Sequence, residues 1–138
     1  MIRYFNEDIK PPQIKRKVFN KWIKSIVELN QMRIGDINFI FCSDQYLLQI
    51  NKEYLQHDYF TDIITFNNNS NNLISGDIYL SIETIAANAK TYQVSFINEL
   101  KRVMIHGILH LIGFDDQNID QQTVMRQKED EALNMFDS

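Results

Sequence analysis

The residues best suited to chemistry in this sequence lie together between Val103 and Asp116. His106 and His110, two of the chain's three histidines, stand four positions apart in a run that is otherwise apolar. On a helix, that spacing projects both imidazole rings from one face. A buried polar group without a partner costs about 1–3 kcal/mol, and one metal ion would satisfy both rings. Because imidazole binds zinc well, we predict a metal site on this helix.

A third ligand is expected directly after the helix. Gly113 suits the position just past a helix end, and Asp115 and Asp116 follow it. Either carboxylate can fold back toward the two histidines. A zinc ion with three protein ligands keeps its fourth position for water, which is the arrangement of a catalytic site.

Two other interpretations of the histidine pair are weaker. Hydrogen bonds within the core would satisfy two isolated histidines, but the apolar helix, the glycine turn and the two acids together favour a metal. The His-Glu-x-x-His pattern of metalloproteases is absent, because Gly107 occupies the position of its general-base glutamate. Proteolysis by that mechanism is therefore disfavoured.

The elements that must position this site alternate between helical and strand-like patterns. Apolar residues recur at helical spacing from Pro11–Pro12 to Leu29. Strands are predicted at residues 37–42, 61–66 and 76–81, and helices at 44–54, 82–89, 96–112 and 119–136, with Ser43 or Asp44, Ser81 and Ser95 as N-caps. This α+β pattern predicts one small mixed β-sheet with helices packed on it, and the metal site on a buried helix and the following turn.

Length and composition limit the class of protein. The chain has 138 residues, 44% of them hydrophobic and 23% charged, so we expect residues 1–138 to form one globular domain. Cys42 is the single cysteine, so no disulfide can form within the chain, and it is expected to be a buried thiol. No segment has the roughly 20 apolar residues that span a bilayer, and the N-terminus lacks a signal-peptide core. We therefore expect a cytoplasmic protein with no membrane partner.

Positive charge is concentrated near the N-terminus. The formal net charge is −4, yet residues 1–33 hold eight Lys and Arg against three Asp and Glu, a net of +5. We call the cations between residues 10 and 24 the basic segment; they are Lys10, Lys15, Arg16, Lys17, Lys21 and Lys24. The basic segment is either an RNA-binding surface or an ordinary solvated helix face.

Three blocks of the sequence resemble the YbeY family of rRNA-maturation endoribonucleases. The run from His106 to Asp116 is similar to the family signature His-Gly-x-Leu-His-Leu-x-Gly-Tyr-Asp-His. The family block Thr-Asn/Asp-Val-Leu-Ser-Phe resembles residues 61–66, and its Gly-Asp-Ile strand resembles residues 76–78. The resemblance implies a metal-dependent, single-strand-specific endoribonuclease of rRNA maturation and ribosome quality control. It also implies that His106, His110 and Asp116 are the metal ligands and act catalytically through the bound water, with one Zn²⁺ per chain.

The sequence departs from the family pattern at two positions. Asp116 stands where the family usually has a histidine ligand, and a carboxylate remains a legitimate ligand for zinc. Leu55 stands where the family usually carries an arginine that engages phosphate, with Lys52 and His57 as the nearest possible substitutes. Asp62 and Asp77, on the matching blocks, are expected to have structural roles.

The resemblance also implies partners. These are single-stranded rRNA precursor and the small ribosomal subunit or its assembly factors. The loss of the arginine at Leu55 puts catalytic competence in question. The alternatives are a metal-stabilised ribosome-assembly factor without turnover and another metal-dependent hydrolase.

Overall fold

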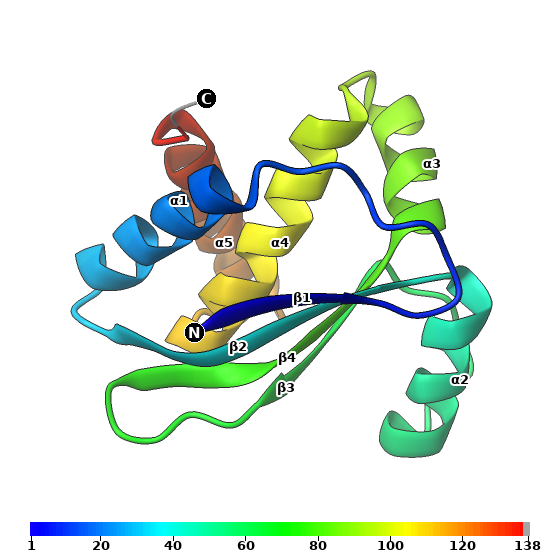
Figure 1. Ribbon diagram of the computed structural model, residues 1–138, viewed down its shortest axis with the longest axis horizontal. Coiled ribbons are helices and arrows are strands. Elements are labelled where there is room, and N and C mark those ends of the chain that lie inside the picture. The colour runs from blue at the N-terminus through cyan, green and yellow to red at the C-terminus, as the bar shows by residue number, and fades with distance from the viewer. Residues whose placement is uncertain (137–138) are drawn as a thin grey trace.

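The computed structural model describes residues 1–136, which form a four-stranded sheet and five helices (Figure 1). In chain order the elements are β1 (Ile2–Asn6), α1 (Arg16–Leu29), β2 (Arg33–Cys42), α2 (Asp44–Leu55), β3 (Ile63–Asn67), β4 (Leu73–Ser81), α3 (Ile82–Tyr92), α4 (Phe96–Ile112) and α5 (Ile119–Asn134). The last two positions of the predicted domain lie outside the described residues.

The sheet is mixed and has the strand order β1-β2-β4-β3. β1 pairs with β2 and β2 pairs with β4 in parallel, whereas β3 and β4 pair antiparallel. The polar run from Asn67 to Asn72 makes the short connection between the antiparallel pair, as its composition predicts. The predicted α+β class with one mixed sheet is therefore confirmed.

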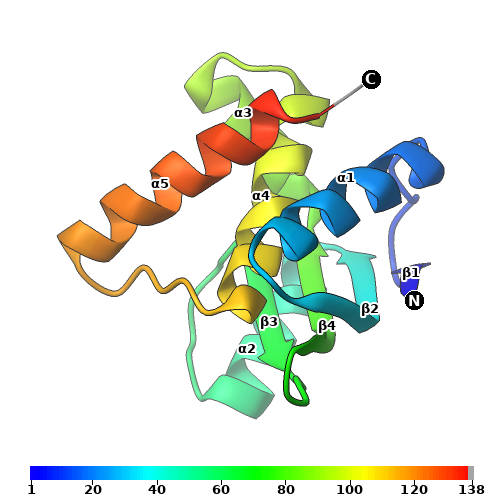
Figure 2. The same ribbon diagram turned by 90° about the vertical axis from the view of Figure 1, so that its left-hand side faces the viewer.

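The two faces of the sheet are covered unequally. Because neighbouring residues of a strand point to opposite faces, Ile78 of β4 joins the larger core, whereas Tyr79 packs on a smaller one. The larger core lies under α1 and α4, and α3 and α5 pack against α4 (Figures 1 and 2). α2 covers part of the opposite face through Leu47 and Ile50. α4 therefore lies between the sheet and α5, which is where the predicted site must form.

The helix boundaries follow local capping chemistry. Ser43, Ser81 and Ser95 each accept a hydrogen bond from a backbone N–H in the first turn of α2, α3 and α4, as predicted. α1 begins at Arg16 and not at the predicted Pro11–Pro12, and no side chain caps it. The sequence patterns did not identify β1, a short strand that is formed through pairing with β2.

Candidate metal centre

Gly107 brings α4 close to the sheet and thereby orients the two histidines. A Cβ atom at position 107 would lie 2.9 Å from Cδ1 of Ile63 and 3.0 Å from Cγ2 of Ile78. With the Gly107 side of the helix against the sheet, His106 and His110 project from its flank and are only partly buried. A side chain at residue 107 would therefore force Ile63 or Ile78 to shift.

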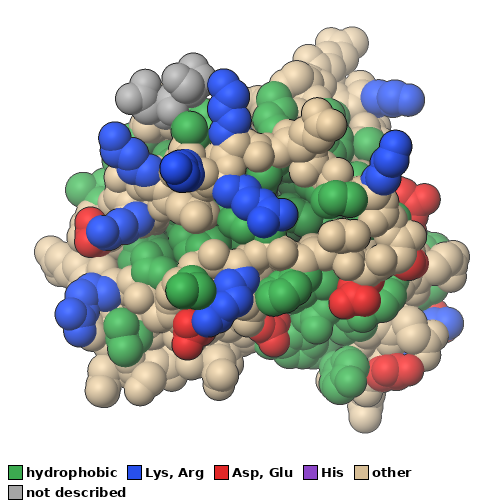
Figure 3. Space-filling model, viewed as in Figure 1, with side chains coloured by type: hydrophobic (Ala, Val, Ile, Leu, Met, Phe, Trp, Pro, Cys, Tyr) green, Lys and Arg blue, Asp and Glu red, His purple; other side chains and the backbone are tan. Residues whose placement is uncertain are grey.

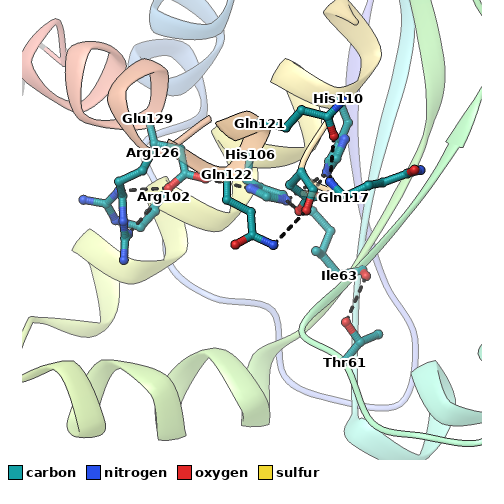
Figure 4. A network of polar contacts seen from close by, with 11 residues as sticks. Thr61, Ile63, Arg102, His106, His110, Gln117, Gln121, Gln122, Arg126 and Glu129 are labelled. Atoms are coloured by element: carbon teal, nitrogen blue, oxygen red, sulfur yellow. Dashed lines mark hydrogen bonds and ion pairs between the residues drawn. The ribbon is translucent and has the colours of Figure 1, made fainter. Parts of the chain in front are cut away.

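Three potential ligand atoms converge at the C-terminal end of α4 (Figure 4). The Nε2 atoms of His106 and His110 lie 3.0 Å apart, and Oδ2 of Asp116 lies 3.3 Å from the first and 3.5 Å from the second. Ligands of a tetrahedral zinc ion at about 2.0–2.1 Å are separated by about 3.3–3.4 Å. The donor set and its spacing therefore fit a zinc-sized ion, and His106, His110 and Asp116 could hold one.

The turn after α4 selects between the two aspartates. Gly113 has φ = 126°, a conformation that side chains disfavour, and it turns the chain back beside the helix. The backbone carbonyl of Asp116 then accepts a hydrogen bond from Nε2 of Gln122, at 3.1 Å, in α5. Asp115 is exposed and lines a separate surface hollow. Of the two candidate carboxylates, the structure thus brings Asp116 to the histidines.

Glu129 of α5 forms a hydrogen bond with Nδ1 of His106, the ring nitrogen that does not face His110. Its Oε2 atom lies 2.6 Å from Nδ1 of His106, and its Oε1 atom accepts a hydrogen bond from Nη1 of Arg102 at 2.9 Å. Figure 4 shows the His106 ring between Glu129 on one side and His110 on the other. A carboxylate at Nδ1 keeps the proton there and turns the Nε2 lone pair toward His110 and Asp116. This role was not predicted, because nothing local in the sequence links an acid on the last helix to a histidine on α4.

The titration behaviour of this pair reflects burial and mutual contact. Burial lowers the pKa of His106, but the hydrogen bond and charge of Glu129, together with the charges of Asp116 and Asp62, outweigh burial, so the pKa of His106 is raised. Burial raises the pKa of Glu129, but the contacts with His106 and Arg102 prevail and lower it. Burial also raises the pKa of Asp62, with the charge of His106 acting in the opposite direction.

A cavity of about 310 Å³ opens beside the convergent ligand atoms, between α3, α4 and α5. His106 and Asp116 line one end of it, and Arg102 and Arg126 also contribute to its wall. Asp62 contributes its side chain to this cavity. The structural role that the sequence suggested for Asp62 belongs to its backbone carbonyl, which accepts a hydrogen bond from Ser81 at 3.0 Å. Asp77, in contrast, accepts a hydrogen bond from Asn38 within the sheet, as expected.

The position of the family arginine lies outside this cavity. Leu55 is the last residue of α2, is 40% exposed and does not line the cavity. The two suggested substitutes also lie elsewhere, since His57 stacks on Tyr59 and Lys52 pairs with Asp58. The cations that line the cavity among the described residues, Arg102 and Arg126, lie on α4 and α5.

The basic segment is exposed and lies on α1 and the loop before it. Its face carries scattered Lys and Arg side chains, and no histidine is visible on that face (Figure 3). The basic segment does not form the wall of the cavity among the described residues.

Comparison with known proteins identifies the family to which the chain belongs. The family model described as Endoribonuclease YbeY matches residues 3–137. The chain belongs to the YbeY family. A YbeY relative from Parabacteroides distasonis, named an endoribonuclease, is 46% identical over 96% of this chain and 93% of its own length. Another from Christiangramia forsetii with the same name is 49% identical over 86% of this chain and 82% of its own length.

A solved structure supports the fold of this YbeY protein. The solution structure of a Thermotoga maritima protein is similar with a TM-score of 0.66 and 27% identity. The similarity covers 97% of this chain and 87% of the Thermotoga protein. The predicted family resemblance is therefore confirmed over nearly the whole chain.

Proposed function

We propose that this protein is a metal-dependent endoribonuclease that cleaves single-stranded precursor rRNA, with residues 1–138 acting as one cytoplasmic domain. The observation that carries the proposal is the convergence of His106, His110 and Asp116 at the end of a polar cavity, in a chain whose relatives are named endoribonucleases. Among the described residues, no helix is long and apolar enough to cross a membrane.

The proposed ion is Zn²⁺, one per chain, held by His106, His110 and Asp116. Two imidazoles and a carboxylate are common zinc ligands, and their separations of 3.0–3.5 Å suit its tetrahedral shell. When bound, such an ion supplies Lewis-acid chemistry, which activates water and offsets negative charge on phosphate oxygens.

The protein groups around the ligands have separate tasks in this proposal. Glu129 keeps His106 in the tautomer that leaves Nε2 free. Arg102 is held by Glu129 and Asp130, at 2.9 and 2.8 Å, and stabilises the carboxylate that orients His106. Arg126 is exposed and only 3.7 Å from Glu129. Its guanidinium group is available to contact the phosphate backbone of the RNA.

Cleavage of single-stranded RNA by matched histidine variants tests the proposal. We expect the wild type to cleave, His110→Ala to lose activity, and His57→Ala to retain it, since His57 is an exposed histidine outside the cavity. Removal of metal with a chelator should abolish cleavage, and added zinc should restore it. Elemental analysis should find about one zinc ion per chain in the wild type and His57→Ala proteins.

Equal trace activity in the wild type and His110→Ala proteins would contradict the proposal. It would favour a metal-stabilised ribosome-assembly factor without turnover, the alternative raised by Leu55. Full metal content in a variant lacking both His106 and His110 would refute the ligand assignment.

A further inference from the structure

Glu99 is a buried residue whose side-chain carboxylate has no hydrogen-bonding partner within residues 1–136. It lies in the first turn of α4 and is only 4% exposed. Buried glutamates are rarely found unpaired, and the three other buried polar side chains, Asn51, Ser81 and Glu129, all make hydrogen bonds. Among the described residues, no group donates a hydrogen bond to the side-chain carboxylate of Glu99 or forms an ion pair with it, and Arg102, one turn further along α4, bonds to Glu129 and Asp130 instead.

The side chain of Glu99 contributes to the cavity that adjoins the candidate metal centre. Burial raises the pKa of Glu99, and the nearby charge of Arg102 opposes that change. An ionised carboxylate only accepts hydrogen bonds, so its natural ligand is a group with N–H or O–H donors. The cavity therefore contains an acceptor that a bound molecule can satisfy.

Part of the remaining wall suits a flat heterocycle, and the rest includes Asp62, Asp116 and Glu129. Val103 and Met125 supply apolar surface, and the exposed ring of Tyr92 stands at the opening. Asn88 and Arg126 add hydrogen-bond donors. A volume of about 310 Å³ is at the lower end of the range for small-ligand pockets. Proteins that read single-stranded RNA commonly take an unstacked base into such a site, stack it on an aromatic ring and contact its Watson–Crick edge.

We propose that this cavity binds one unpaired guanine base of the RNA substrate, with the Glu99 carboxylate accepting hydrogen bonds from the base. Guanine presents two adjacent donors, N1–H and the N2 amino group, which match the two oxygens of a carboxylate. Adenine and cytosine offer one amino group beside an acceptor, and uracil offers one N–H between two acceptors. The inference rests on the proposed action on RNA and adds a base preference next to the metal centre.

Binding of short 2′-O-methyl oligonucleotides tests the inference without a need for turnover. Each fluorescent probe carries guanine, inosine, adenine or uracil at one central position in a uridine background, and gel analysis verifies that it stays intact. Fluorescence anisotropy with the wild type should give an affinity for guanine roughly tenfold above that for inosine, which lacks the N2 amino group. This comparison requires no variant and so does not depend on whether a mutant folds.

The variant Glu99→Gln should reduce the guanine preference, because an amide offers a single acceptor oxygen. Glu131→Gln, an exposed glutamate of α5 outside the cavity, is the matched control and should keep it. Metal content should be unchanged in both. Equal affinities for all four probes, or an undiminished preference in Glu99→Gln, would overturn the inference. RNA cleavage without base preference would refute only the guanine site, whereas guanine-selective binding without cleavage would refute only the proposed nuclease activity.

Discussion

Replacement of Glu129 by glutamine should weaken metal binding without removing a proposed ligand. Glu129 contacts Nδ1 of His106 at 2.6 Å and accepts a hydrogen bond from Arg102 at 2.9 Å. The glutamine amide has one acceptor oxygen, so it can serve one of these two donors while its own N–H groups face the other. One charge-assisted hydrogen bond, about 1.5–3 kcal/mol, is therefore lost.

That loss corresponds to a decrease in zinc affinity of roughly ten- to a hundredfold, if His106 is the partner that loses its contact. Competition with a chromophoric zinc chelator near neutral pH measures the affinity directly. Glu131→Gln is the control, because this exposed residue forms an ion pair only with Lys128, at 3.6 Å, among the described residues. Circular dichroism and thermal melting should establish that both variants are folded.

A folded Glu129→Gln variant that binds zinc as tightly as the wild type would contradict this role of Glu129. In that case the contact with His106 would be a consequence of packing and would not orient the ring. Glu129→Asp keeps the negative charge but shortens the side chain, so it distinguishes the effect of the charge from that of the contact distance. It should bind zinc less tightly than the wild type if the distance of 2.6 Å is what matters.

The other predictions concern single positions or one segment. Asp116→Ala should lose zinc and Asp115→Ala should keep it, whereas the reverse result in elemental analysis would exchange the two carboxylates. Leu55→Arg should leave both melting temperature and cleavage rate near the wild-type values, because Leu55 is exposed and outside the cavity. A faster rate would instead place substrate phosphate at the end of α2. Burial, with added repulsion from Asp8 and Glu7, raises the pKa of Cys42 to about 12. Roughly one part in ten thousand is then thiolate at pH 8, so a thiol reagent should label Cys42 only after unfolding. Charge reversal at Lys15, Arg16 and Lys17 in the basic segment should make RNA affinity depend less steeply on salt concentration if this face contacts RNA. An unchanged salt dependence would indicate that the segment is an ordinary solvated helix face.

Local signals in the sequence were sufficient for most of the fold. The capping serines, the β-branched strands and the turn at Gly113 each carry their own conformational preference, so they predicted elements that the structure contains. β1 carries no such signal, because a short strand at a terminus is specified by its partner and not by its own pattern. Its parallel register with β2, in which Ile2 faces Ile37, depends on contacts between residues far apart in the sequence.

The candidate site also has residues that local sequence signals predict and residues that only tertiary packing brings together. His106 and His110 could be predicted because a helix fixes their spacing, and a carboxylate after Gly113 followed from the turn. The sequence could not choose between Asp115 and Asp116 without the family resemblance, since the choice depends on the exact path of the turn. Glu129 could not be assigned at all, because only the packing of α5 on α4 brings it to His106.

Gly107 connects these observations to the type of chemistry. A glutamate at this position serves as the general base in the metalloprotease motif, which requires its side chain to reach the metal. Here, position 107 packs on Ile63 and Ile78 of the sheet, and even one added carbon would come within 3.0 Å of them. The face of α4 that would carry such a base therefore packs against the sheet. The acids near the histidines come instead from other elements, with Asp116 on the turn and Glu129 on α5. A helix docked in this way can present two histidines to a metal, but it must take its acidic groups from segments that pack beside it.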